Sequence, residues 1–268
     1  MYRLIASDLD GTLLNRNHQI STHTADILTR IQQHQVHILI ATGRHYRDVH
    51  RIAKDFPFPM YLITSNGARV HTSEGEKIMQ RDVPPTAVDD ILRLTEGCTF
   101  YRNLYHDDNW FVEADNERVL SYTNVSGFSY TRTDFAKVTR TGISKMLFIG
   151  DPDELNVLER VLVERYGTNL NITFSLPTCL EVMGQDVNKG TALQNVLERL
   201  SLTSDDVIAF GDGLNDKEML EMAKTGVIMA NADRRLKSQL PDNPQTIDND
   251  HDGVADYLSQ AFAEQLAQ

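Results

Sequence analysis

Two carboxylates spaced two positions apart follow the first apolar stretch of the chain. Asp8 and Asp10 stand in the run Asp8-Leu9-Asp10-Gly11-Thr12, directly after Leu4-Ile5-Ala6. Where a buried strand of an open α/β sheet runs into a loop, its last side chains face the crevice in which chemistry usually takes place. A carboxylate is a competent nucleophile toward phosphorus, and a second carboxyl can protonate a leaving oxygen and later activate water. We therefore expect Asp8 to attack phosphorus and Asp10 to move a proton.

Three further polar segments lie beside predicted strands or helices. They are Thr42-Gly43-Arg44 after a strand at 36–41, Lys189 before a helix at 190–200, and Gly211-Asp212-Gly213-Leu214-Asn215-Asp216 after a strand at 207–210. Phosphoryl transfer depends mainly on positioning and charge neutralisation. The Thr42 hydroxyl and the Gly43 N–H are suited to hold phosphate oxygens, and Lys189 is suited to neutralise their charge. We expect Asp212 and Asp8 to bind Mg²⁺, which prefers oxygen ligands and leaves room for a substrate phosphate.

The apolar periodicity predicts an α/β protein with one domain inserted into another. Strands at 2–7, 36–41 and 61–64 alternate with helices that begin at Ser21 and Tyr46, which indicates a Rossmann-like, mainly parallel sheet. The same alternation resumes after residue 185. The segment between mixes helices near 86–95 and 152–166 with a hairpin around 106–109 and strands at 145–149, 170–175 and 179–183. We expect a core formed by 1–83 and 185–268, and an inserted α+β domain at 84–184.

Composition narrows the class of protein. The chain has 268 residues and a formal net charge of −12, and no cluster of Lys or Arg offsets that charge, so nucleic acid is not an expected partner. It shows neither a leader peptide nor the apolar run of about eighteen residues that a membrane helix requires. We therefore expect a cytoplasmic protein with no membrane partner. Cys98 and Cys179 are far apart in sequence, and we expect both to be free, packed thiols.

The order of these segments resembles the four motifs of the haloacid dehalogenase superfamily of phosphohydrolases. The matching residues are Asp8 to Leu13, Thr42 after its strand, Lys189, and Gly211 to Asp216. The insertion between the second and third motifs is similar to the larger α/β cap of the Cof-type branch. So are the sequences at 41–44, 64–68, 180–182 and 188–190. Within that branch the chain looks most like bacterial sugar-phosphate and pyridoxal-phosphate phosphatases.

The resemblance implies a role for each matching position. Asp8 would become a phosphoaspartate, while Asp10 would serve as general acid and then as general base. The metal would lie between Asp8, Asp212 and the backbone carbonyl of Asp10, and Asp216 would orient Lys189 or a metal-bound water. The groups that would meet phosphate oxygens are the Leu9 backbone, Thr42, Gly43, Lys189 and Asn215. The implied function is Mg²⁺-dependent hydrolysis of small phosphate monoesters, such as sugar phosphates or pyridoxal 5'-phosphate.

Several alternatives stay open at this point. A phosphomutase or a non-catalytic binding module could share the scaffold, and Arg44 and Glu181 are only candidates for contact with the substrate. Asn66-Gly67 is typical of a hairpin turn, but it could equally line the mouth of the pocket. Residues 248–253 imitate the start of a calcium-binding EF-hand loop. Position twelve of that loop is Ser259 instead of the bidentate Glu that calcium requires, so we expect a turn that caps the last helix.

Overall fold

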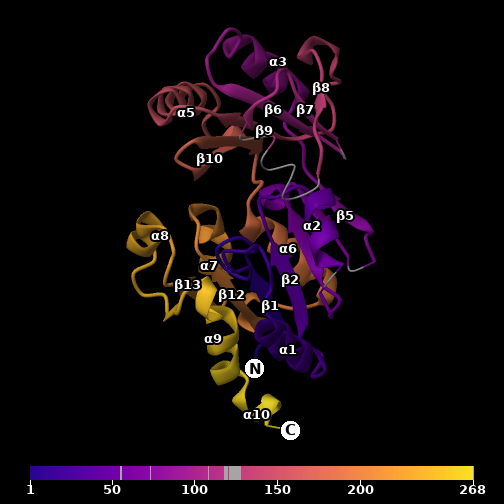
Figure 1. Cartoon of the computed structure of the whole chain (residues 1–268), viewed down its shortest axis with the longest axis vertical. Helices are drawn as coiled ribbons and strands as arrows, with labels where there is room; N and C mark the ends of the chain where they lie inside the picture. The colour runs from indigo at the N-terminus through magenta and orange to yellow at the C-terminus, as the bar shows by residue number, and fades with distance from the viewer. Residues whose placement is uncertain (55, 73, 108, 118–119, 121–127, 268) are drawn as a thin grey trace. The chain divides into compact units, whose positions relative to one another are not determined.

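A computed structural model describes all residues except 55, 73, 108, 118–119, 121–127 and 268 (Figure 1). The chain divides into two compact units. Unit 1 contains Met1–Gly43, Ile52–Met79 and Asn188–Gln268, and unit 2 contains Arg44–Arg51 and Gln80–Val187. The domain boundaries expected at 83/84 and 184/185 stay predictions.

Unit 1 is built on a sheet of eight strands. Their spatial order is β14 (Gln245–Thr246), β13 (Thr225–Met229), β12 (Val207–Gly211), β1 (Leu4–Ser7), β2 (His37–Ala41), β3 (Tyr61–Thr64), β4 (Arg69–His71) and β5 (Lys77–Gln80). Neighbouring strands from β14 to β3 run parallel, whereas β3 and β4 are antiparallel. The predicted mainly parallel α/β sheet is confirmed.

Helices connect these strands or follow the last of them, and some are capped at the N-terminus by a side chain. They are α1 (Thr22–Gln32), α2 (Tyr46–Ala53), α6 (Lys189–Leu200), α7 (Lys217–Met222), α8 (Arg234–Gln239), α9 (Gly253–Ala261) and α10 (Ala263–Leu266). The Ser21 hydroxyl accepts the Thr24 N–H at 3.0 Å, and Asn188 Oδ1 accepts the Thr191 N–H at 2.7 Å. Each cap satisfies a backbone donor that the helix itself leaves unpaired. α1 packs beside α9, and α6 packs beside α7.

The described residues of unit 2 include a sheet of six strands, two helices that pack against it, and most of α2. The strand order is β10 (Leu170–Leu176), β11 (Cys179–Gly184), β9 (Ile143–Ile149), β6 (Tyr101–His106), β7 (Asn109–Val112) and β8 (Thr131–Arg132). The helices are α3 (Pro85–Leu94) and α5 (Pro152–Tyr166). The predicted hairpin at 106–109 is confirmed, because His106 on β6 pairs with Asn109 on β7.

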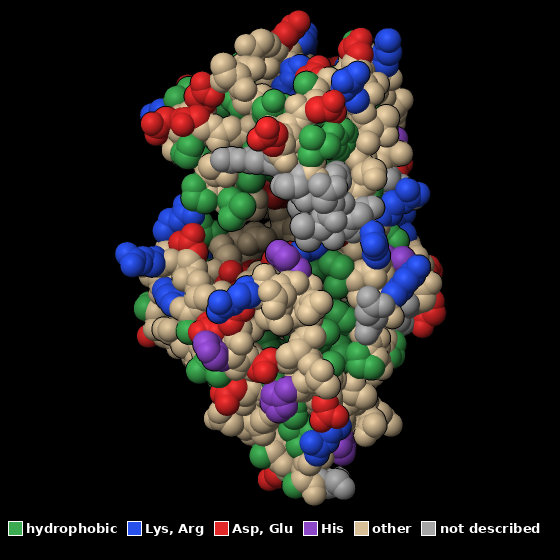
Figure 2. Space-filling view, viewed as in Figure 1, with side chains coloured by type: hydrophobic (Ala, Val, Ile, Leu, Met, Phe, Trp, Pro, Cys, Tyr) green, Lys and Arg blue, Asp and Glu red, His purple; other side chains and the backbone are tan. Residues whose placement is uncertain are grey.

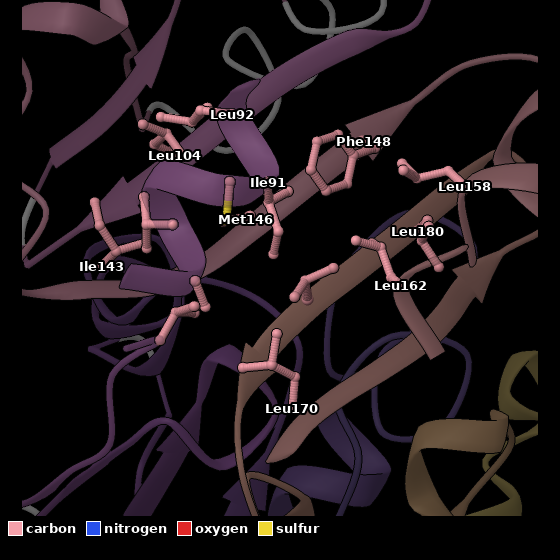
Figure 3. Packing of buried hydrophobic residues seen from close by; sticks show 14 of the residues in the cluster. Ile91, Leu92, Leu104, Ile143, Met146, Phe148, Leu158, Leu162, Leu170 and Leu180 are labelled. Carbon is pink, nitrogen blue, oxygen red and sulfur yellow. The ribbon is translucent and has the colours of Figure 1, made fainter. Parts of the chain in front are cut away.

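The two faces of this second sheet differ. One face packs against α3 and α5 and forms an apolar core, in which Ile91, Phe148 and Leu162 lie together (Figure 3). Side chains alternate between the faces of a strand, so Leu180 and Val182 enter this core while Glu181 between them does not. The opposite face carries Glu181 and a second, smaller cluster of buried side chains that includes Tyr105, Trp110 and Leu147.

The surface and the helices test two expectations from composition. Acidic and basic side chains are interspersed over the face of each unit that is visible in Figure 2. Among the described residues, no helix combines the length and the hydropathy needed to cross a bilayer. Cys98 and Cys179 are free thiols, but Cys98 is exposed. The expectation of a packed thiol was wrong for Cys98, because its loop after α3 lies at the surface.

Candidate active site

Three of the four predicted polar segments follow strands that are neighbours in the unit 1 sheet. β12, β1, β2 and β3 lie side by side and run parallel. The residue after β12 is Asp212, the residue after β1 is Asp8, and the residue after β2 is Thr42. The carboxyl ends of parallel strands meet at one edge of the sheet, which is where open α/β proteins bind their ligands. The topology therefore brings segments from distant parts of the sequence together.

Lys189 links two of these segments. It is the first residue of α6, and its Nζ donates to Asp8 Oδ1 and to Asp216 Oδ1, each at 2.5 Å. The Lys189 and Asp216 side chains are fully buried, and Asp8 is nearly so. A buried lysine is stable as a cation only when anions compensate its lost hydration. The structure supplies those anions from β1 and from the loop after β12.

Asp212 contacts the first loop through Thr12, a residue for which the sequence predicted no role. The Thr12 hydroxyl donates to Asp212 Oδ1 at 2.9 Å. Gly11, which has a φ of +76°, permits this approach, since a Cβ there would lie 2.5 Å from Asp212 Oδ2. Thr12 is the last residue of the run Asp8-Leu9-Asp10-Gly11-Thr12. Its place in this motif is the signal that could have identified it as a site residue.

Asp216 holds both Lys189 and its own loop. Its second oxygen, Oδ2, accepts the N–H groups of Asp212 at 2.9 Å and Gly213 at 2.8 Å. Because Asp216 also accepts from Lys189, one carboxylate fixes the lysine relative to the Asp212 backbone. Its role in orienting Lys189 during a reaction stays a prediction.

Asn66 joins the second and fourth loops. Asn215 Nδ2 donates to Asn66 Oδ1 at 3.0 Å, and the Asn66 N–H donates to the Thr42 carbonyl at 3.0 Å. Residues Ser65–Gly67 form a 3₁₀ turn that connects the antiparallel strands β3 and β4. Asn66-Gly67 therefore belongs to a turn between two antiparallel strands, which was one of the two expected alternatives. The Asn66 side chain also contacts Asn215, a predicted phosphate-binding residue.

The remaining expected residues differ in their surroundings. Leu9 is buried, and its carbonyl accepts the Leu14 N–H at 2.8 Å. The Asp10 side chain keeps 40% of its surface exposed, and its Oδ1 lies 3.5 Å from His18 Nδ1. Arg44 and Glu181 lie in unit 2 and not in unit 1.

Burial perturbs the ionisable groups of the site. It raises the pKa of Asp8 well above its usual value; Lys189 lowers that pKa, while the negative charge of Asp216 raises it further. Burial and Asp216 raise the pKa of Asp212 to about 7, although the Thr12 hydrogen bond and Lys189 oppose this shift. Burial lowers the pKa of Lys189, but Asp216 and Asp8 outweigh this effect and raise the net value. Lys189 is therefore charged, and the carboxylates need further positive charge.

The carboxylates also have the arrangement of a metal site. Asp8, Asp212 and Asp216 each offer an oxygen, and these atoms lie within 4.8 Å of one another. An all-oxygen donor set suits a hard divalent cation such as Mg²⁺. The raised pKa values of Asp8 and Asp212 fit the same interpretation, because a cation at this position would favour their ionised forms.

This fold and this group of residues belong to a family of known enzymes. The family model of haloacid dehalogenase-like hydrolases matches residues 5–258, and the chain belongs to this family. It is an enzyme of the phosphatase class. The HMP-PP phosphatase of Yersinia pestis (strain Pestoides F) is 38% identical over 258 residues, which cover 96% of this chain and 94% of that protein. The HMP-PP phosphatase of Escherichia coli O6:H1 is 36% identical, covering 97% and 95% of the two chains.

Solved structures agree with the family assignment. A haloacid dehalogenase-like hydrolase from Bacteroides thetaiotaomicron has a TM-score of 0.86 and 28% identity, covering 98% of this chain and 100% of that chain. A haloacid dehalogenase-like hydrolase from B. subtilis has a TM-score of 0.87 and 26% identity, covering 96% and 99%. A catalytic protein is thus established, and the alternative of a non-catalytic binding module is set aside.

Proposed function

We propose that this chain is a Mg²⁺-dependent phosphatase that hydrolyses small-molecule phosphate monoesters through a phosphoaspartate on Asp8. One observation carries the proposal: buried Lys189 bridges Asp8 and Asp216, with Asp212 beside them, at the carboxyl ends of parallel strands. This arrangement combines a carboxylate nucleophile with cationic charge, as phosphoryl transfer requires. We further propose that the reaction takes place in the cytoplasm.

In the first half of the proposed reaction, an Asp8 carboxylate oxygen forms a bond to phosphorus while the bond to the leaving oxygen breaks. Lys189 fixes the Asp8 carboxylate through its hydrogen bond to Oδ1. Asp10 gives its proton to the leaving oxygen, so that an alcohol departs. The Leu9 backbone, Thr42, Gly43, Lys189 and Asn215 hold the phosphate oxygens.

In the second half, Asp10 takes a proton from water, and the water oxygen attacks phosphorus. The bond between phosphorus and Asp8 breaks, which releases inorganic phosphate and restores both carboxyl groups. Asp8, Asp212 and the Asp10 carbonyl would hold Mg²⁺, and Asp216 would fix Lys189 from behind. When bound, the ion supplies positive charge that offsets repulsion between the Asp8 carboxylate and the phosphate.

The choice of leaving group is a second part of the proposal. The related proteins from Yersinia pestis and Escherichia coli carry the name HMP-PP phosphatase, so HMP-PP belongs in the first substrate panel beside sugar phosphates and pyridoxal 5'-phosphate. We propose that the inserted domain at 84–184 selects among them. The proposed substrate contacts in unit 2 are Arg44 and Glu181. An Arg44 guanidinium nitrogen lies 3.3 Å from Asp48 Oδ2, and Glu181 Oε2 lies 3.0 Å from Lys145 Nζ.

Phosphate release from this panel, with Mg²⁺ and with chelator, tests the proposal. We expect chelator-sensitive release by the wild type and none above background by Asp8→Asn. Asp242→Asn is a matched control, because Asp242 is an exposed carboxylate of unit 1 outside the site. Circular dichroism would check the fold of both variants. Activity in folded Asp8→Asn would remove Asp8 from the mechanism, and a requirement for a bisphosphate activator would favour a phosphomutase.

A further inference from the structure

The loop after Asp10 is closed by one asparagine. Asn15 Oδ1 accepts the N–H groups of Asn17 at 2.9 Å and Gln19 at 3.2 Å. The Asn15 N–H donates to the Gln19 carbonyl at 3.0 Å, and the His18 N–H donates to the Asn15 carbonyl at 2.9 Å. An asparagine that bonds to the backbone two residues ahead is a common way to fix a tight turn. His18 is therefore held at a defined position.

His18 has an unusual backbone conformation and faces the predicted acid. Its φ is +55°, a value that is uncommon for residues other than glycine. Its Nδ1 lies 3.5 Å from Asp10 Oδ1, and the two side chains are 53% and 40% exposed. Such backbone conformations cluster at functional sites, where the surrounding structure enforces them. Here the Asn15 turn enforces the conformation that accompanies the contact between His18 and Asp10.

The C-terminal part of unit 1 fastens this loop. Asp250 accepts the Arg16 N–H at 2.7 Å and Arg16 Nε at 2.8 Å. Asn249 Nδ2 donates to the Leu14 carbonyl at 2.8 Å, and Asn231 Nδ2 donates to the Gly11 carbonyl at 2.7 Å. The segment that imitates a calcium loop in the sequence thus anchors the loop that carries His18. Asp248 caps its turn by accepting the N–H groups of Asp250 and His251.

We propose that His18 is a positioning residue that holds the Asp10 carboxyl in the orientation needed for proton transfer to the leaving oxygen. This inference rests on the proposed function, since it requires Asp10 to act as the acid. A carboxyl that is 40% exposed samples several rotamers in water, and contact with a fixed imidazole restricts them. Proton transfer depends on this orientation, because donor and acceptor must lie within hydrogen-bond reach.

A positioning role through Asp10 has a specific kinetic signature. A poor leaving group, such as an alkyl alcohol, needs a proton from the acid, whereas p-nitrophenolate departs with little help. His18→Gly keeps the positive φ without strain and removes only the side chain. We expect His18→Gly to lower the single-turnover rate of alcohol release from an alkyl phosphate roughly ten-fold, as part of the ~10²–10⁴-fold contribution of acid–base catalysis. For p-nitrophenyl phosphate we expect less than about a two-fold change, with KM unchanged for both substrates.

The chain offers a matched control. His34 is an exposed histidine of unit 1 outside this loop and outside the segment that anchors it, so His34→Ala removes an imidazole away from Asp10. We expect this variant to match the wild type with both substrates. In the same single-turnover assay, which reports only the first half of the reaction, Asp10→Asn should show the same leaving-group dependence as His18→Gly, only larger. The double variant should lose no more activity than Asp10→Asn alone, because residues that act through one another are not additive.

Two results separate the inference from the function on which it rests. If Asp10→Asn loses alkyl phosphate hydrolysis but His18→Gly does not, the positioning role is wrong and the proposed function stands. An equal loss by His18→Gly in the single-turnover rate of leaving-group release from both substrates, or additive losses in the double variant, would also overturn the role. If Asp10→Asn hydrolyses alkyl phosphates as well as the wild type does, Asp10 is not the acid, and both proposals fall.

Discussion

Each unit of this protein buries a lysine against carboxylates, but the balance of charge differs between them. In unit 1, Lys189 lies between Asp8 and Asp216, and Asp212 completes a group of three carboxylates within 4.8 Å among the described residues. In unit 2, Lys145 Nζ lies 3.0 Å from Glu181 and 4.8 Å from the centre of the Tyr105 ring. In the first group three carboxylates lie around one lysine, whereas in the second Lys145 and Glu181 form an ion pair beside Tyr105.

This difference separates a site of chemistry from a site of binding or structure. Burial of unbalanced charge raises the pKa of carboxyl groups, as it does at Asp8 and Asp212, and it creates a place for a metal ion. An ion pair beside an aromatic ring compensates part of its own desolvation. Perturbed groups of the first kind mark functional sites, and the comparison predicts different consequences when either lysine is removed.

We expect the largest effect from Lys189→Met, which should slow catalysis. We expect kcat for phosphate release to fall by about 10²–10³-fold, the range seen when one group that stabilises developing charge is removed. Lys224→Met is the control, because Lys224 is exposed in unit 1. Steady-state kinetics with Mg²⁺, on protein whose fold is checked by circular dichroism, would measure the effect. Full activity in folded Lys189→Met would contradict the catalytic role that distinguishes Lys189 from Lys145.

Lys145→Met should act mainly on stability. It leaves Glu181 buried without its cation, which costs about 3–5 kcal/mol when one partner of a buried pair is removed. Urea unfolding of Lys145→Met and of the double variant Lys145→Met/Glu181→Leu would measure the cost. We expect the double variant to recover most of the lost free energy of unfolding. A single variant as stable as the wild type would mean that the pair does not contribute as a buried ion pair.

The stability of unit 1 without metal should depend on pH. Asp212 has a pKa of about 7 in the folded protein, above its ordinary value of 3.8. Protonated Asp212 therefore stabilises the folded state. Its contribution to the free energy of unfolding is present at low pH and is lost as pH rises toward 7. Mg²⁺ should raise the melting temperature by about 3 °C or more at pH 8 and by much less at pH 5. Equal shifts at both pH values would contradict the charge imbalance in unit 1.

Thr12→Val should have the smallest effect. It removes the hydroxyl that donates to Asp212 Oδ1, and loss of a partner that orients a metal ligand typically weakens metal affinity by about 10–100-fold. We expect a result near the lower value, because Asp212 keeps its other surroundings. Titration of activity with Mg²⁺ would show a higher half-saturating concentration with nearly unchanged kcat. An unaltered Mg²⁺ requirement would show that Thr12 does not position Asp212.

Local patterns predicted the fold class because strand and helix periods are local properties of the sequence. The strand ends that precede Asp8, Thr42 and Asp212 followed from the same patterns. The contacts of Thr12 with Asp212, Asn66 with Asn215, and Lys145 with Glu181 did not, because each joins residues from separate segments of the chain. Their positions depend on strand order and register, which apolar periodicity does not specify.

The His18 contact is missing from the sequence prediction for a different reason. His18 and Asp10 are close in sequence, but their contact depends on a positive φ at His18 and on the Asn15 turn. The exposure of Cys98 is similar in kind, since residue type alone predicts burial for cysteine. Backbone conformation and loop placement decide both cases.

We propose that Asp8 is the residue that carries the phosphoryl group. Asp10→Asn keeps the nucleophile and lacks the base that activates water, so with p-nitrophenyl phosphate and Mg²⁺ its phosphoenzyme should accumulate. Acid quenching, borohydride reduction and peptide mass spectrometry identify a phosphorylated aspartate, because reduction converts it to homoserine. We expect homoserine at position 8. Phosphate release by Asp10→Asn with homoserine at another aspartate, or at none, would contradict it.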